Sequence, residues 1–396
     1  MELTLLGTGG PEGLPEPDCP CAACALAVGA GTRAATAVVV DGVVLLDLTP
    51  GMALAAARAG QPLGGLRLVV LSHPHDGPPL EIPPGLPAPA RLPDGQRLPL
   101  ITGHRVEALA MDAPGTGYAV ESPSGLRLLY LPPGCAPAGL AEFHGPPYDL
   151  VLLDLVGRPD ALARLRAAGA VTRTTDVVAV HLDHHAAPEP ELTRRLAALG
   201  ARAVPDGTTL AVGDYQQVPD VPRRTLVLGG ARSGKSAEAE RRLAAFPGVV
   251  YVATGGTRED DPDWALRVSQ HRERRPPGWR TEETCDLLPL LADADGPPLL
   301  IDCLGLWLTH AVDDAAAWSD PAALADVHAR TAALTTAWRT TRRTVVAVSN
   351  EVGSGIVPAT PSGRLFRDEL GRLNAAISAE SERVLLVVAG NAVTLR

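Results

Sequence analysis

Short apolar runs alternate with amphipathic segments through the second half of the chain. Runs rich in Val, Ile and Leu, typical of buried strands, occur at residues 225–228, 249–253, 299–303, 345–349 and 384–388. Between them, apolar residues recur at helical spacing in residues 236–245, 263–275 and 364–382. Such alternation is typical of a mostly parallel sheet with helices on both faces, so we expect a doubly wound α/β domain here.

The first half contains more strands and turns. Residues 36–48 form two β-rich runs around Asp41-Gly42, a strong hairpin signal, and residues 117–131 predict a second hairpin. Other strand-like runs and two helical patterns occur at residues 1–7, 66–72, 149–156, 160–168, 177–181 and 189–199. This mixture predicts β-sheets flanked by helices, with the Pro-rich residues 83–99 as an irregular surface loop.

The chain of 396 residues is too long for one ordinary hydrophobic core. Residues 214–223 are polar, contain two prolines and separate the two patterns, so we interpret them as a linker. The expected domains are therefore residues 1–213 and residues 224–396.

Composition and charge argue against several classes of protein. The hydrophobic share is 46% and the formal net charge is −10, which argues against a general surface for nucleic acid or anionic membrane. No apolar run reaches the roughly 18 residues of a membrane span, and the N-terminus lacks a signal-peptide pattern. The six cysteines form no disulfide framework. We expect a soluble cytoplasmic protein.

Lysine and arginine together number 35, yet Lys235 is the only lysine. It lies in a G-x-x-x-x-G-K-[ST] motif directly after a predicted strand and before a predicted helix, which is the context of a phosphate-binding loop. A compact ammonium fits between phosphates inside such a loop, whereas a planar guanidinium does not. The sequence therefore predicts a P-loop NTPase-type domain that binds a nucleoside triphosphate through Gly229, Gly230, Ala231, Arg232, Ser233, Gly234, Lys235 and Ser236.

A second feature lies on the predicted helix at residues 263–275. Arg267, His271 and Arg275 are spaced four residues apart and share one face. Neighbouring guanidiniums lower the pKa of an imidazole and neutralise a triphosphate, which favours nucleophilic attack by His271 on phosphorus. An ordinary basic surface helix with an incidental histidine explains the pattern equally well.

Taken in order, the motifs of the second half resemble those of the bifunctional adenosylcobinamide kinase/adenosylcobinamide-phosphate guanylyltransferases of cobalamin biosynthesis. The resemblance covers roughly residues 224–396 and rests on residues 229–236, 267–271, 275–281, 300–304, 350–358 and 364–374. It implies phosphorylation of adenosylcobinamide by ATP or GTP, then transfer of GMP from GTP to adenosylcobinamide phosphate through a GMP-histidine. It also implies a homo-oligomer.

The resemblance implies roles for individual residues. His271 matches the guanylylated histidine, and Lys235 and Ser236 match the contacts to phosphate and Mg²⁺. Asp302 ends a strand beside the loop and is expected to hold Mg²⁺, with helix capping as the alternative. Glu351 is expected in a second loop at the site, with no role assigned. Further nucleotide contacts are expected from Thr254, Gly255, Arg272, Arg274, Arg275 and Glu283.

The first half resembles metallo-β-lactamase-fold phosphodiesterases, in particular the branch with the phosphonate-pathway cyclic phosphodiesterase and the pyrroloquinoline quinone biosynthesis protein B. The resemblance rests on residues 7–15, the C-x-C-x-x-C motif at residues 19–24 and the H-x-x-H motif at residues 181–184. It implies an αββα sandwich and a structural zinc ion held by Cys19, Cys21, Cys24 and His184. Three cysteines buried in a tight loop are the alternative.

The catalytic metal centre of that fold is incomplete in this sequence. Gly77 and Pro78 replace the Asp and His of the H-x-H-x-D-H motif, and a middle histidine and a bridging aspartate are missing. His73, His75 and His181 remain as possible ligands of a residual metal site. Two-metal hydrolysis needs more ligands than these, so we expect a degenerate active site retained for packing, assembly or substrate delivery.

Three alternatives stay open at the level of the sequence. The second half could be a simple P-loop small-molecule kinase in which His271 is idle. The first half could be an additional metal-dependent phosphodiesterase, or a purely structural partner of the second half.

Overall fold

The computed structural model describes the chain except residues 75–81, 141–142, 144, 215–220, 256–274 and 277. The chain divides into two units, Met1–Asp220 and Val221–Arg396. This division falls within residues 214–223, which the sequence predicts as a linker. No helix in the described ranges combines the length and apolar character needed to cross a membrane.

The first unit contains two sheets. One has the strand order β11-β1-β2-β3-β4, with bounds Thr208–Ala211, Glu2–Gly7, Ala37–Val40, Val44–Leu46 and Leu68–Val70. The other has the order β10-β9-β8-β7-β6-β5, with bounds Asp176–Ala179, Leu150–Leu153, Arg127–Tyr130, Thr116–Glu121, Arg105–Ala110 and Arg97–Pro99. Both expected hairpins form, as β2–β3 and β7–β8.

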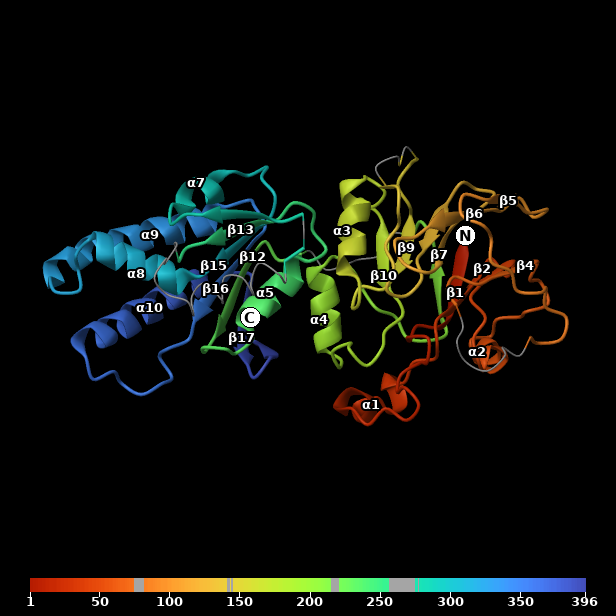
Figure 1. Cartoon of the computed structure of the whole chain (residues 1–396), viewed down its shortest axis with the longest axis horizontal. Coiled ribbons are helices and arrows are strands. Elements are labelled where there is room, and N and C mark those ends of the chain that lie inside the picture. Colours follow the sequence, from red (N-terminus) through yellow and green to blue (C-terminus); the bar gives the residue numbers. More distant parts are fainter. Residues whose placement is uncertain (75–81, 141–142, 144, 215–220, 256–274, 277) are drawn as a thin grey trace. The chain divides into compact units, whose positions relative to one another are not determined.

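One core joins the two sheets of the first unit. Leu3 and Val38 of the first sheet pack in the same buried cluster as Tyr118 and Leu128 of the second. Helix α2 (Met52–Arg58) buries Met52 and Ala56 on the opposite face of the first sheet. Helices α3 (Pro159–Ala167) and α4 (Glu191–Ala198) lie beside β9 and β10 (Figure 1). This is the expected sandwich of two sheets flanked by helices.

The second unit has one sheet, in the order β14-β13-β15-β16-β12-β17-β18. The strand bounds are Arg280–Glu283, Val250–Ala253, Leu299–Asp302, Val345–Asn350, Arg224–Gly229, Arg383–Val388 and Asn391–Thr394. All neighbours in this sheet are parallel except β17 and β18. The mostly parallel sheet predicted from the sequence is confirmed.

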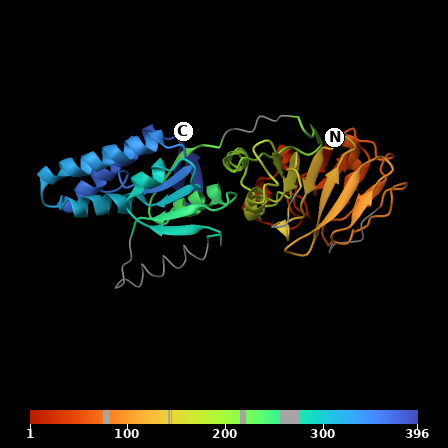
Figure 2. The ribbon, with the colours of Figure 1, turned by 90° about the horizontal axis from the view of Figure 1, so that it is seen from above.

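Helices cover both faces of this sheet. Helices α8 (Leu304–Asp314), α9 (Leu324–Thr340) and α10 (Pro361–Ala379) gather on one side (Figures 1 and 2) and share a core with β12, β15 and β16. Helix α5 (Lys235–Leu243) packs Ala239 and Leu243 on the other side. The short helix α7 (Leu287–Ala292) packs against α9.

The sequence pattern missed several of these elements. Helix α9 buries only Val327, Leu334 and Trp338, which is too sparse for a clear helical stripe. Strand β14 reads Arg-Thr-Glu-Glu and lies at the sheet edge, so it lacks an apolar run. In the first unit, residues 97–99 of the expected irregular loop form β5. The helix predicted at residues 263–275 falls almost entirely outside the described residues.

Trp338 is the residue on which the packing of α9 is best tested. Its side chain is completely buried, and its indole N–H donates to Ser381 Oγ at 3.1 Å. We expect Trp338→Ala to lower the free energy of unfolding of the second unit by about 3–5 kcal/mol, measured by urea denaturation. Trp318→Ala, at a partly exposed position, is the control and should cost much less; an equal loss in both variants would contradict the assigned core.

Candidate functional site

The glycine-rich loop lies between β12 and α5, where the sequence predicted it. Gly234 adopts a left-handed backbone (φ +97°) immediately before α5 begins at Lys235. A Cβ at Gly229 would lie 2.4 Å from Ser233 Oγ and 2.7 Å from Val387 O, so no larger residue fits there. The two glycines of the motif are therefore required, one by packing and one by backbone conformation.

Neighbouring strands hold this loop in place. Gly390, in the turn between β17 and β18, donates its N–H to Ser233 O at 2.8 Å. Glu351, directly after β16, donates its N–H to Gly229 O at 3.1 Å. The ammonium of Lys235 donates to Gly230 O at 3.1 Å, so the side chain lies over the loop. This arrangement suits a phosphate group bound at the N-terminus of α5.

Asp302 lies at the same edge of the sheet, but its strand is not next to the loop strand. Strand β16 separates β15 from β12, which corrects the expectation of a strand beside the loop. The carboxylate of Asp302 accepts a hydrogen bond from Tyr251 Oη at 2.6 Å. Because the strands are parallel, their carboxyl ends share one edge, and Asp302 lies there with Gly229.

Thr254 links the ends of β13 and β15. Its buried hydroxyl donates to Cys303 O at 2.7 Å and accepts from Cys303 N at 2.9 Å. Cys285 donates its thiol to Thr254 O at 3.3 Å. The hydroxyl of Thr254 therefore clamps two strand ends together, a role that the sequence did not reveal.

A cavity of about 340 Å³ opens next to Thr254. Three predicted nucleotide contacts line it together: Thr254, Gly255 and Glu283. Sequence reasoning missed other lining residues, namely Thr284, Cys285, Thr309, His310 and Asp313. His310 and Asp313 belong to α8, which the sequence pattern did not predict, so they could not be placed at this edge.

Arg275 is the described member of the predicted arginine–histidine group. Its guanidinium carbon lies 3.3 Å from the centre of the Tyr251 ring, and its Nη1 donates to Thr281 Oγ1 at 2.9 Å. Its buried Nε–H has no acceptor among the described residues. The other predicted residues of this group, Arg267, His271, Arg272 and Arg274, lie outside the described residues.

Glu351 shapes its own loop. Its Oε1 accepts from Gly353 N at 2.8 Å and from Ser354 N at 3.2 Å. These bonds fold the segment after β16 back on itself next to the phosphate loop. A direct role of Glu351 in binding stays a prediction.

A glycine-rich loop between a buried parallel strand and a helix, with an aspartate at the same sheet edge, defines the second unit as a P-loop protein. Known proteins with similar sequences match this part of the chain. A family model for cobinamide kinase / cobinamide phosphate guanyltransferase matches residues 225–395. The chain belongs to this family, and its second unit has both activities, as the sequence resemblance predicted.

Individual relatives cover the same region. The bifunctional adenosylcobalamin biosynthesis protein CobU of Salmonella typhimurium is 36% identical over 180 residues, which is 43% of this chain and 98% of that protein. The corresponding protein CobP of Pseudomonas aeruginosa is 44% identical over 172 residues, or 42% and 94%. Among solved structures, a diphosphatase from the PhnP family covers 55% of this chain and 99% of its own, with 20% identity and a TM-score of 0.40.

The first unit brings Cys19, Cys21, Cys24 and His184 together. Their ligand atoms all lie within 4.8 Å of one another, and within the described ranges no other such group of three or more was found. Cys19 Sγ is 3.5 Å from His184 Nδ1, although 165 positions separate them in the chain. Glu16 also approaches His184 Nδ1, at 2.8 Å. Such a group can hold a metal ion.

The thiols of this cluster differ in their tendency to ionise. The N–H of Cys24 donates to Cys21 Sγ at 3.4 Å, and this hydrogen bond lowers the pKa of the Cys21 thiol. Burial raises the pKa of Cys24 to about 11. Three sulfurs with one imidazole suit a closed tetrahedral metal site.

The possible residual metal site is only partly described. The rings of His73 and His181 lie 6.2 Å apart and nearly perpendicular. His181 Nε2 lies 3.1 Å from Leu131 O, whereas its buried Nδ1 has no partner in the described part of the chain. His75 lies outside the described residues. The structure thus brings two of the three predicted ligands near each other, and the site itself stays a prediction.

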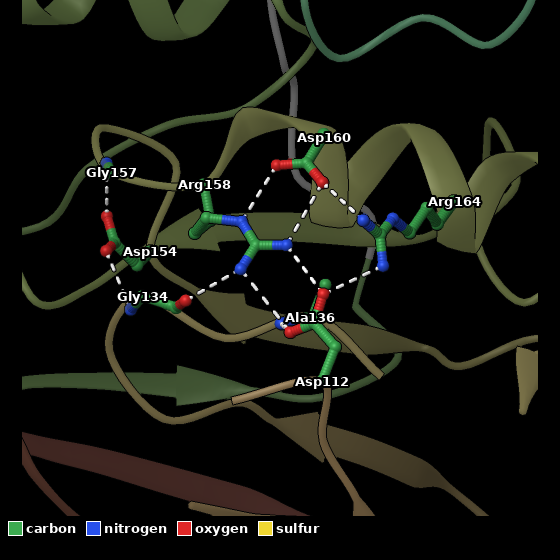
Figure 3. Close-up of polar contacts among 8 residues, drawn as sticks. All are labelled: Asp112, Gly134, Ala136, Asp154, Gly157, Arg158, Asp160 and Arg164. Atoms are coloured by element: carbon green, nitrogen blue, oxygen red, sulfur yellow. Dashed lines mark hydrogen bonds and ion pairs between the residues drawn. The ribbon is translucent and has the colours of Figure 1, made fainter. Parts of the chain in front are cut away.

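Ion pairs connect three loops of the second sheet of the first unit. Asp112, in the loop after β6, pairs with Arg158 at 2.8 Å and with Arg164 at 2.9 Å (Figure 3). Arg158 also donates to Asp160 and to Gly134 O, both at 2.9 Å. The network joins the loops after β6, β8 and β9.

Because the pKa of Asp112 is lowered, the contribution of these ion pairs to stability can be tested by varying the pH. The hydrogen bond from Arg158 lowers the pKa of Asp112 to about 2, against about 3.9 in an unfolded chain. A lowered carboxyl pKa stabilises the fold above about pH 4, and this stabilisation is lost as the pH falls towards 2. We expect Asp112→Asn to cost about 1–2 kcal/mol in the free energy of unfolding at neutral pH, a gap that narrows below pH 4 in urea titrations.

The exposed Asp214 is a suitable control for that titration. Asp214→Asn should change the free energy of unfolding little at any pH. A gap between wild type and Asp112→Asn that stays constant from neutral pH to pH 3 would show that the ion pairs do not stabilise the unit.

Proposed function

We propose that the second unit carries out its two reactions at one triphosphate site. A nucleoside triphosphate, ATP or GTP, first phosphorylates the aminopropanol hydroxyl of adenosylcobinamide. GMP is then transferred from GTP to that phosphate, which gives adenosylcobinamide-GDP and pyrophosphate. The observation that carries this proposal is the phosphate loop, held between β12 and α5 at the same edge of the sheet as Thr254 and Asp302.

Ser236 and Asp302 have the oxygen ligands that suit Mg²⁺. Ser236 lies in the first turn of α5, and Asp302 lies at the carboxyl end of β15, on which α5 packs. When bound, Mg²⁺ would neutralise charge on the triphosphate. Lys235 would bind the phosphates from the loop side, while the loop amides orient them.

His271 would be the nucleophile of the second reaction. A ring nitrogen of His271 attacks the α-phosphorus of GTP, the bond to the β-phosphate oxygen breaks, and pyrophosphate leaves. An oxygen of adenosylcobinamide phosphate then attacks the same phosphorus and releases the histidine. This assignment rests on the spacing of Arg267, His271 and Arg275 and on the family, because His271 lies outside the described residues.

Substitution of His271 should separate the two reactions. We expect His271→Ala to abolish covalent labelling by α-labelled GTP and to stop GMP transfer, while phosphorylation of adenosylcobinamide continues near the wild-type rate. Lys235→Ala should lower both rates by at least about a hundredfold, because both reactions use the same loop. The label on wild-type protein should be labile to acid and stable to alkali.

His328→Ala is the matched control, since His328 lies on α9 and pairs with Glu369. It should keep the label and both activities. GMP transfer that persists in His271→Ala would replace the covalent route with direct in-line transfer. A wild-type protein that phosphorylates adenosylcobinamide but never becomes labelled would favour a simple kinase.

We also propose that Cys19, Cys21, Cys24 and His184 hold one structural zinc ion in the first unit. The close approach of the four side chains supports this. Reduced cysteines fit a reducing compartment such as the cytoplasm. We further propose that the protein forms a homo-oligomer, as the family resemblance implies.

Metal analysis tests the zinc proposal. We expect about one zinc ion per chain in the purified protein and a loss of at least tenfold in occupancy in Cys21→Ser, measured by elemental analysis. Cys135→Ser, at another cysteine of the first unit, should retain the ion. A metal-free wild type, or full zinc content in Cys21→Ser, would contradict the site, whereas a second ion would support the residual site at His73 and His181.

A further inference from the structure

Tyr251 lies at the centre of a row of side chains that crosses three strands. It pairs with Thr281 of β14 in the sheet register, and Asp302 of β15 pairs with Ala253, two residues further along β13. Only 3% of Tyr251 is exposed. The row therefore runs from the edge of the sheet to the aspartate that we assign to Mg²⁺.

On one side, Tyr251 determines the orientation of Asp302. Its hydroxyl donates to Asp302 Oδ2 at 2.6 Å, the short distance of a charge-assisted hydrogen bond. A carboxylate held in this way has one oxygen occupied and its rotation restricted.

On the other side, the ring of Tyr251 holds Arg275. The guanidinium lies over the ring at 3.3 Å, which is a cation–π contact, and Thr281 Oγ1 accepts a hydrogen bond from the same group. The Nε–H of Arg275 has no acceptor in the described residues. Arg275 follows His271 by four positions in the sequence, so Tyr251 and Thr281 anchor the chain just after the proposed nucleophile.

We propose that Tyr251 is a positioning residue for both reactions: its hydroxyl orients Asp302 for the triphosphate-bound cation, and its ring holds Arg275 for a phosphate oxygen of GTP. The inference rests on the proposed function of this site. Tyr251 touches no reacting atom in it, and it acts only through Asp302 and Arg275.

Two conservative substitutions separate the two contacts. Tyr251→Phe keeps the ring over which Arg275 lies and removes the hydroxyl that binds Asp302. Thr281→Val keeps Tyr251 and removes the hydrogen bond that Arg275 donates. Thr281 is exposed, so this change should not disturb the core.

We expect Tyr251→Phe to raise the Mg²⁺ concentration for half-maximal rate about tenfold in both reactions. The KM for adenosylcobinamide should not change. Thr281→Val should slow formation of the GMP-enzyme about three- to tenfold and leave the Mg²⁺ requirement at the wild-type level. All measurements use the full chain, with thermal unfolding recorded for each variant.

The outcomes are distinct from those that test the proposed function. A Tyr251→Phe protein with the wild-type Mg²⁺ requirement overturns the link to Asp302, and a Thr281→Val protein labelled at the wild-type rate overturns the link to Arg275. Loss of all activities in parallel with a lower melting temperature shows a packing role only. If wild-type protein forms no GMP-enzyme, the transfer mechanism fails, while the kinase reaction of Tyr251→Phe still tests the link to Asp302.

Discussion

The left-handed backbone of Gly234 is the constraint on which the second unit depends. The chain leaves a buried strand and enters a helix within a few residues, and a side chain at Gly234 would add about 1–2 kcal/mol of backbone strain. Gly229 is equally restricted, because the loop folds back to within contact of its Cα. With both glycines in place, α5 begins at the end of the loop and the Lys235 ammonium lies over it.

The parallel sheet then brings the remaining groups to that loop. Strands β13, β15, β16 and β12 run in the same direction, so the residues that follow them collect at one edge. Thr254, Asp302 and Glu351 come from three different strands, and hydrogen bonds to Cys303, Tyr251 and Gly353 hold each of them. The positions of these three side chains are therefore fixed by the sheet and by the residues that share hydrogen bonds with them.

The first unit contains two polar clusters of different chemistry. Its cysteine–histidine cluster is assembled from residues far apart in the chain. At the edge of the second sheet, in contrast, Asp112, Arg158 and Arg164 join loops through ion pairs. These loops are held together by charge pairs of the protein itself.

The sequence by itself determined the features that depend only on residues close together in the chain. The phosphate loop spans eight residues and the three cysteines span six, so spacing alone indicated their chemistry. The alternation of strands and helices likewise predicted the sheet of the second unit. Only the tertiary structure placed Tyr251 between Asp302 and Arg275, and His310 and Asp313 beside Thr254. Those contacts join separate strands and a helix that the sequence pattern did not predict. Distances across a sheet depend on strand order and register, and no local run of residues encodes these.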